Sequence, residues 1–288
     1  NEAGYTESNI MLYPEINPIF ISLGPLELHW YGLMYVLGFL FAWKLALIKV
    51  KNESFFISEN QVDELIFYGA LGVIIGGRLG YIFFYGFDAW LKDPIILLRI
   101  WEGGMSFHGG LIGVIIAVVI FSYKQKLRFW PVMDLVAVIT PVGLFTGRLG
   151  NFINGELWGS PSNLPWAMKV GCAERADLCL NKLNLTLEDK FTPALHPTQL
   201  YEAFFEGLIL FIILWIYSSK PRVISSISSL FLIGYSFFRF FIEFLRIPDS
   251  HLGYFAFNWL TLGQILCIPM FIAGIVLYWQ SKNMKIEK

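Results

Sequence analysis

Charged residues are scarce in this chain of 288 residues. Asp, Glu, Lys and Arg make up only 15% of it, against about 25% in soluble domains, whereas 56% of the residues are hydrophobic. This shortage excludes a purely soluble protein, because one core cannot bury so many apolar residues. The net charge of −1 provides no positive field for nucleic acid, so we expect no nucleic-acid partner.

Several motifs of common enzyme classes are also missing. The sequence contains no His-Glu-x-x-His, Cys-x-x-Cys, Gly-x-Ser-x-Gly or Walker pattern. We therefore predict no metal site and no cofactor, and expect that an enzyme of this kind takes its nucleophile from a substrate. Cysteines are few, and Cys172 and Cys179 share one long connection. They form a disulfide if that connection faces an oxidising periplasm, or else remain two free thiols.

Long hydrophobic runs are abundant instead. A helix needs about 20 mostly apolar residues to cross a bilayer. The sequence predicts an all-α polytopic membrane protein with about seven transmembrane helices, a single membrane-embedded domain over 11–288, and an external segment at about 151–198. We interpret residues 1–10 as a non-native remnant before a natural start at Met11. The expected spans are 28–48, 64–86, 107–123, 131–150, 199–218, 227–246 and 259–280.

Lysine and arginine gather at one set of span ends. They cluster around 44–51, 124–128, 220–222 and 282–288, whereas 11–27 contains none. Because short cytoplasmic loops are rich in these residues, the clusters predict a cytoplasmic C-terminus and an N-terminus outside the cell membrane. The long connection at 151–198 then faces the exterior.

Glycines recur at every fourth position in three expected spans. Such small residues allow helices to approach closely in a membrane, although one pair alone can arise by chance. The pattern predicts a tight central bundle, and it comprises Gly72, Gly76, Gly80, Gly109, Gly113, Gly143 and Gly147.

Arginines within the spans need an explanation. An ionised side chain at mid-bilayer costs roughly 2.5–3.5 kcal/mol, so Arg78, Arg148 and Arg239 should face an internal polar site. Arg239 shares one helical face with Tyr235, Glu243 and Arg246. A simpler interpretation is that Arg239 and Glu243 form a structural ion pair.

An excess of arginine over acid favours an anionic ligand. Besides Glu243, the acids expected in these spans are Glu202 and Glu206, which are four residues apart. We expect these acids to leave a surplus of positive charge. The guanidinium group matches phosphate oxygens, and phospholipid headgroups are the abundant anions of a bilayer.

Two further segments bring polar groups to the outer ends of spans. His108 precedes two glycines that leave room for a ligand, and a histidine can exchange protons near neutral pH. Asn151, Asn154 and Glu156 lie in a glycine-rich turn after Arg148, where amides can bind glycerol or phosphate oxygens. The simpler alternatives are an interfacial histidine bonded to a carbonyl group and a turn stabilised by its own hydrogen bonds.

The combined segments resemble one known family. The stretch Gly147-Arg148-Leu149-Gly150-Asn151-Phe152-Ile153-Asn154-Gly155-Glu156 is similar to the signature of bacterial prolipoprotein diacylglyceryl transferases. The resemblance covers nearly all of 12–280 and is weakest at about 160–192. The other similar segments, in the same order, are His29-Trp30-Tyr31-Gly32, Gly77-Arg78, His108-Gly109-Gly110, His196-Pro197-Thr198-Gln199-Leu200-Tyr201-Glu202 and Arg239-Phe240-Phe241-Ile242-Glu243.

The resemblance implies an enzyme of the bacterial inner membrane whose active site is toward the periplasm. Such enzymes transfer the diacylglyceryl group of phosphatidylglycerol to the lipobox cysteine of a prolipoprotein signal peptide, forming a thioether and releasing glycerol 1-phosphate. Arg148 and Arg239 match the family's essential arginines, and His108 matches the histidine proposed as the base. Tyr31, Asn151, Glu156, Tyr235 and Glu243 match other important positions, while Arg78, Asn154 and Arg246 are expected to support substrate binding.

Two other functions would also account for some of these features. A transporter of lipids or organophosphates would need buried arginines, but transporters often contain repeated halves and helices interrupted at midplane. The sequence has no internal repeat, and its richest motif lies at an outer span end. A non-catalytic membrane scaffold would not need a cationic surplus inside the bundle.

Overall fold

The computed structural model describes residues 11–24, 26–52, 55, 57–99, 104–173, 175–186, 188–247, 255–257 and 259–282. The expected remnant at 1–10 lies outside the described residues. The chain divides into two compact units. Unit 1 contains the described parts of Asn1–Gly38, Thr140–Ile216 and Ser229–Gln280, and unit 2 contains those of Phe39–Ile139, Tyr217–Ser228 and Ser281–Lys288.

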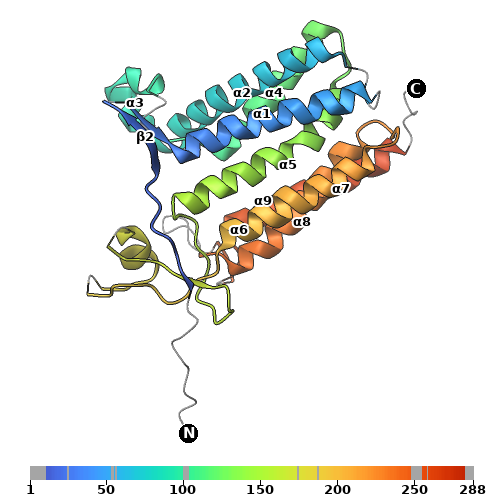
Figure 1. Ribbon diagram of the computed structural model, residues 1–288. Helices are drawn as coiled ribbons and strands as arrows, with labels where there is room; N and C mark the ends of the chain where they lie inside the picture. The colour runs from blue at the N-terminus through green and yellow to red at the C-terminus, as the bar shows by residue number, and fades with distance from the viewer. Residues whose placement is uncertain are drawn as a thin grey trace. The chain divides into compact units, whose positions relative to one another are not determined.

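Apolar helices dominate both units (Figure 1). Within the described residues, six are long and apolar enough to cross a membrane, and α4 (Phe107–Gln125) is a shorter apolar helix. These helices confirm the prediction of an all-α polytopic membrane protein. The six are α1 (Trp30–Lys51), α2 (Glu59–Tyr85), α5 (Phe129–Ile153), the run Thr198–Tyr217, the run Ser226–Leu245 and α9 (Leu262–Ser281).

Two of these runs change geometry along their length. The run Thr198–Tyr217 consists of α6 (Thr198–Glu202), a π-helical segment η5 (Ala203–Ile209) and α7 (Leu210–Tyr217). The run Ser226–Leu245 consists of α8 (Ser226–Ile242) and a final 3₁₀ turn, η6 (Glu243–Leu245). Since π-helical turns are rare and occur often at functional sites, η5 is a candidate part of such a site in unit 1.

Glycines bring α2 and α4 together in unit 2. A Cβ atom placed on Gly72 would lie 2.6 Å from the carbonyl oxygen of Gly113, and one on Gly80 would lie 2.7 Å from the Cα of Gly109. Larger residues would therefore force these backbones apart. The prediction of close packing is confirmed for these two helices.

The third glycine pair behaves differently. A Cβ on Gly143 or Gly147 in α5 would meet no atom of the described residues within 4 Å. In α5, therefore, the recurring glycines do not themselves mark positions where a side chain would clash, as the alternative of a chance pair allowed. The close approach to this helix comes from Gly38 of α1, where a Cβ would lie 2.6 Å from the Thr146 hydroxyl oxygen and 3.4 Å from the Gly143 Cα.

Unit 1 packs α8 against α7 and α9. A Cβ on Gly234 would lie 2.7 Å from Leu210, and one on Gly274 would lie 2.8 Å from Ile233. Gly207 in η5 makes a similar approach to α5, where a Cβ would lie 2.7 Å from Phe145. These contacts hold α8 and η5 close to their neighbouring helices.

Short strands and helices were not anticipated from hydrophobic length. Strands β2 (Ile19–Leu23) and β3 (Leu26–His29) pair antiparallel before α1, and β1 (Met11–Leu12) pairs parallel with β4 (Met168–Lys169). The helix α3 (Phe87–Lys92) and the 3₁₀ turn η2 (Pro94–Leu97) follow α2. Elements this short carry too few residues for a periodic sequence signal.

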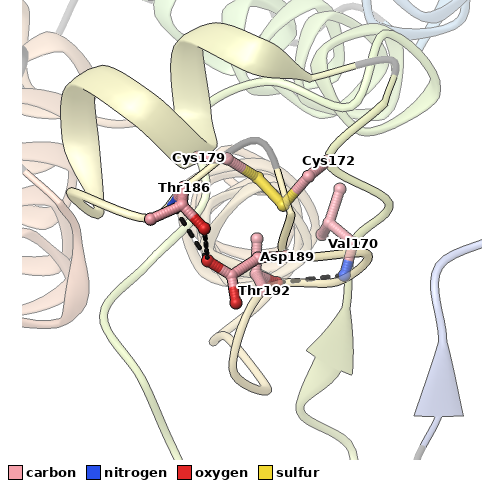
Figure 2. Close-up of a disulfide and its surroundings, with 6 residues drawn as sticks. All are labelled: Val170, Cys172, Cys179, Thr186, Asp189 and Thr192. Carbon is pink, nitrogen blue, oxygen red and sulfur yellow. Dashed lines mark hydrogen bonds between the residues drawn. A yellow bond between two sulfur atoms is a disulfide. The ribbon is translucent and has the colours of Figure 1, made fainter.

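The connection between α5 and α6 is a folded segment held by a disulfide. Cys172 and Cys179 are bonded, which decides between the two alternatives left open by the sequence (Figure 2). The bond joins residues near β4 to a π-helical turn, η4 (Asp177–Lys182). Nearby, the Asp189 carboxylate accepts hydrogen bonds of 2.8 Å from both the backbone and hydroxyl groups of Thr186, and these bonds lower the pKa of Asp189.

A small apolar core supports the same segment. The buried side chains of Tyr13, Trp158 and Leu195 pack together, and the Tyr13 ring meets Trp158 edge-on at 5.2 Å between centroids. The Tyr13 hydroxyl donates to the backbone oxygen of Phe152 at 2.6 Å. Burial raises the pKa of Tyr13, which keeps its hydroxyl proton in place for that bond. These contacts fix the end of α5, where the polar turn begins.

Candidate active site

Arg148 on α5 faces two acids of the next helical run. Its Nε lies 3.0 Å from the Glu202 carboxylate, and its Nη2 lies 3.9 Å from that of Glu206. Its Nη1 donates a long hydrogen bond of 3.4 Å to the side-chain oxygen of Asn151. Both glutamate side chains are fully buried, whereas the Arg148 side chain is 17% exposed. Arg148 is therefore held by buried acids while part of its own side chain remains accessible.

Arg239 on α8 shares the same acid. Its Nη1 lies 2.8 Å from Glu202 and 2.6 Å from Glu243. Both ion pairs use Nη1. The Nε and Nη2 groups of Arg239 make no hydrogen bond to any described residue. A Cβ on Gly263 would lie 3.0 Å from the Glu243 carboxylate and 3.6 Å from Nη2, so this glycine packs against the ion pair.

Glu202 connects three arginines. One of its oxygens contacts Arg239 and also lies 3.6 Å from Arg246, while the other contacts Arg148. The sequence indicates that Glu202 is an acid within a span, but its role in the site was not predicted. Its spacing from Glu206 placed both acids on one helix face, yet did not show which arginines they meet.

The charges of this cluster balance. Three arginines and three glutamates take part: Arg148, Arg239, Arg246, Glu202, Glu206 and Glu243. The expected surplus of positive charge is therefore wrong for unit 1. The physical reason is that Glu202 and Glu206 both turn inward, where ionised carboxylates need nearby cations.

The turn after α5 has its own polar network. The side-chain amides of Asn151 and Asn154 donate to Glu156 Oε1 at 2.8 and 3.4 Å. Gly155 has a φ of +64°, a conformation that favours glycine. The side-chain oxygen of Asn154 is buried and accepts no hydrogen bond from the described residues, so it can accept one from a ligand. All three predicted turn residues are thus brought together.

Two tyrosines lie beside these groups. A Cβ on Gly150 would lie 2.9 Å from the ring of Tyr31, which places this ring against the end of α5. The Tyr31 hydroxyl shares a hydrogen bond of 3.1 Å with Tyr35. Tyr235 is buried one turn before Arg239 on α8 and stacks on Phe231. Unit 1 therefore contains most of the predicted site residues.

The remaining two predicted site residues belong to unit 2. Arg78 on α2 donates to the backbone oxygens of four residues that follow, at 3.4 Å to Leu97, 3.3 Å to Gly104 and 2.9 Å to Arg99, and also to Ile96. The backbone of His108 lies in the first turn of α4, but its side chain lies outside the described residues. The contacts of Arg78 indicate that it stabilises this loop.

Comparison with known proteins identifies the family. The profile described as "Prolipoprotein diacylglyceryl transferase" matches residues 18–280. The chain belongs to this family. A phosphatidylglycerol–prolipoprotein diacylglyceryl transferase of Methylococcus capsulatus is 51% identical over 93% of this chain and 96% of the relative.

Two other family members of the same name are nearly as similar. The relative from Legionella pneumophila is 49% identical over 95% of this chain and its own full length. The relative from Pseudomonas putida is 45% identical over 95% of this chain and 96% of its own. In the family member described here, the buried arginines and acids lie within the matched region.

Proposed function

We propose that this protein transfers the diacylglyceryl group of phosphatidylglycerol to the lipobox cysteine thiol of prolipoproteins, the first step of lipoprotein maturation. The observation that carries the proposal is the convergence of Arg148 and Arg239, from two different helices, on one buried carboxylate. Groups arranged to hold one anion can also bind the oxygens of a phosphate.

Some N–H groups of these two arginines are available to donate hydrogen bonds to the oxygens of a phosphodiester. Nε and Nη2 of Arg239 make no hydrogen bond to the described residues, and the guanidinium of Arg148 is partly exposed. The lipid phosphate would bind to these groups, beside the acids that already orient them. Arg246 contacts Glu202 and would help to hold this acid in place.

The chemistry requires such a site. The cysteine sulfur attacks the glyceryl C3 carbon, the C3–O bond to phosphate breaks, and glycerol 1-phosphate leaves. Arg148 and Arg239 stabilise the negative charge that develops on the phosphate in the transition state. A free thiol has a pKa of about 8.5 and reacts as the thiolate, so His108 is proposed to accept its proton.

The turn after α5 is the proposed site for the glycerol headgroup. Glu156 and the buried side-chain oxygen of Asn154 can accept hydrogen bonds from glycerol hydroxyls. Asn151 connects this turn to Arg148. Tyr31 and Tyr235 would bound the site on either side.

The proposed location is the bacterial inner membrane, with the N-terminus and the site toward the periplasm. The distribution of basic residues supports this orientation. The disulfide between Cys172 and Cys179 supports it as well, because such bonds persist in oxidising compartments. The segment at 151–198 would then face the periplasm.

A single assay tests the proposed activity. Purified protein is mixed with phosphatidylglycerol carrying a labelled diacylglyceryl group and with a lipobox peptide. We expect a thioether-linked peptide together with glycerol 1-phosphate, and a peptide with serine in place of the lipobox cysteine should give no product. Movement of labelled lipid across vesicles without either product would instead support the transporter.

A further inference from the structure

Among the three glutamates of the cluster, Glu206 has the fewest close partners. It lies in the π-helical segment η5 and its side chain is fully buried. Neither of its carboxylate oxygens accepts a hydrogen bond from the residues that the structure describes. Its ion pair with Arg148 is long, at 3.9 Å. A buried carboxylate in this position is costly to keep ionised.

The other two acids of the cluster are held more firmly. Glu202 lies 2.8 Å from Arg239 and 3.0 Å from Arg148. Glu243 lies 2.6 Å from Arg239 and accepts a hydrogen bond of 3.0 Å from the Thr261 hydroxyl. Protonating either of these would break a close ion pair, whereas protonating Glu206 would weaken the long contact with Arg148 and more distant attractions to Arg239 and Arg246.

The charged and titratable groups near Glu206 come from several helices. Glu202 on the same run repels its negative charge, and Arg148 on α5 attracts it. The other groups that face it are Tyr235 and Arg239 on α8, Arg246 after η6, and the buried thiol of Cys267 on α9. Glu206 is therefore close to both negative and positive side chains. An anion added to the cluster would change whether Glu206 is ionised.

A bound phospholipid changes the charge balance. The three arginines and three glutamates sum to zero when all are ionised. A phosphodiester would add one negative charge among largely buried side chains, where repulsion between like charges is strong. A single proton taken up by the cluster would restore neutrality.

We propose that Glu206 takes up a proton when the phospholipid anion binds to Arg148 and Arg239. The equilibrium is balanced: protein with ionised Glu206, lipid anion and one proton from water form a complex in which Glu206 is the neutral acid. Glu206 thereby frees part of the Arg148 guanidinium for the phosphate. The proposal rests on the proposed function, because it takes the lipid phosphodiester as the ligand.

Calorimetric titration measures this proton directly. Short-chain phosphatidylglycerol is titrated into the detergent-solubilised full chain, without peptide, in two buffers that differ in ionisation enthalpy. We expect uptake of about one proton per lipid bound and an affinity that falls by up to about tenfold per pH unit as the pH rises. Zwitterionic phosphatidylcholine should bind without this uptake.

Two variants assign the proton to its residue. Glu206→Gln mimics the protonated acid, so it should bind phosphatidylglycerol with almost no proton uptake and little pH dependence. Cys267→Ser changes another buried group near Glu206 without altering the charge of the cluster, so it should retain the uptake. Uptake that persists in Glu206→Gln, or that is absent from the wild-type protein, would overturn the proposal, and the wild-type result needs no variant to fold.

The thioether assay on the same preparation separates this inference from the proposed function. Thioether formation without proton uptake on lipid binding leaves the transferase activity standing and refutes the role of Glu206. Proton uptake without any thioether product refutes the transferase activity alone.

Discussion

Buried charges are stabilised in two different ways in the two units. In unit 2, Arg78 donates to backbone carbonyls, and Asp134 accepts from the backbone of Ser225 and Ser228 at 2.8 Å each and from the Ser228 hydroxyl at 2.6 Å. In unit 1, Arg148 and Arg239 are paired with carboxylates on other side chains.

The two kinds of partner imply different roles. Charges paired with backbone groups serve the structure, whereas charges paired with side-chain carboxylates can exchange those partners for a ligand. Backbone groups are fixed by the helices and turns that contain them, so the partners of Asp134 cannot leave without local unfolding. A carboxylate on a side chain can be protonated or can give way to an anion from a ligand. We therefore expect the charges of unit 2 to determine stability and those of unit 1 to determine activity.

The largest expected effect is a loss of activity when Arg239 is replaced, which tests whether the charges of unit 1 determine activity. Arg239→Gln should reduce the rate of thioether formation by about 10²–10³, the usual cost of losing a group that stabilises transition-state charge. Labelled phosphatidylglycerol and a lipobox peptide measure this rate in protein that has inserted normally into membranes.

A charge-balanced variant is the control for Arg239. The single change leaves Glu243 without its closest cation, which could destabilise the fold by about 3–5 kcal/mol. The double variant Arg239→Gln/Glu243→Gln has no unpaired carboxylate at position 243 and still lacks the guanidinium of Arg239. Near-normal turnover in the double variant would contradict a role for Arg239 in binding the phosphate.

The next effect should appear in stability. Asp134→Ala removes the acceptor of three hydrogen bonds at the start of α8, and should lower the free energy of unfolding by roughly 3 kcal/mol. Thermal unfolding in detergent measures the loss, and Asp134→Asn should lose less because it keeps one acceptor. A loss of turnover per folded molecule at unchanged stability would contradict the comparison.

Helices were predictable from the sequence, whereas their charge partners were not. Hydrophobic length located the seven apolar helices of the described residues, because crossing a bilayer requires a run of apolar residues. The arginines stood out for the same reason, since lipid tolerates few ions. The contact of Glu202 with arginines of two other helices depends on how the helices rotate against one another, which a single sequence does not reveal.

Local backbone geometry and the partners it provides could not be predicted from the sequence either. No residue pattern marked the π-helical segment η5, although it carries Glu206. Arg78 appeared equivalent to Arg148 as an intramembrane cation, but its partners are carbonyls of a loop that follows α2. The disulfide remained open because pairing depends on the fold of a segment without regular periodicity.

A third, smaller effect concerns the segment between α5 and α6. Cys172→Ser should destabilise this segment by about 2.5 kcal/mol, the chain-entropy value for a short disulfide loop. Limited proteolysis measures it as faster cleavage within 160–192. The matched control is Cys267→Ser, since Cys267 is a buried free thiol in unit 1 and should leave this cleavage unchanged. Equal cleavage of all three proteins would show that the disulfide does not hold the segment.

The smallest expected effect is a pH dependence of stability caused by His196. Burial lowers the pKa of His196 below its ordinary value of 6.5, and its ring shares a hydrogen bond of 3.1 Å with Tyr201. Between the lowered pKa and 6.5 the unfolded chain binds more protons than the folded protein, so stability should fall as the pH falls through this window and stay level above it. Melting temperatures from about pH 7.5 to 5 measure the slope around the histidine pKa. His196→Asn should flatten the slope because asparagine does not titrate. An unchanged slope in that variant would place the titrating group elsewhere and leave His196 with a packing role only.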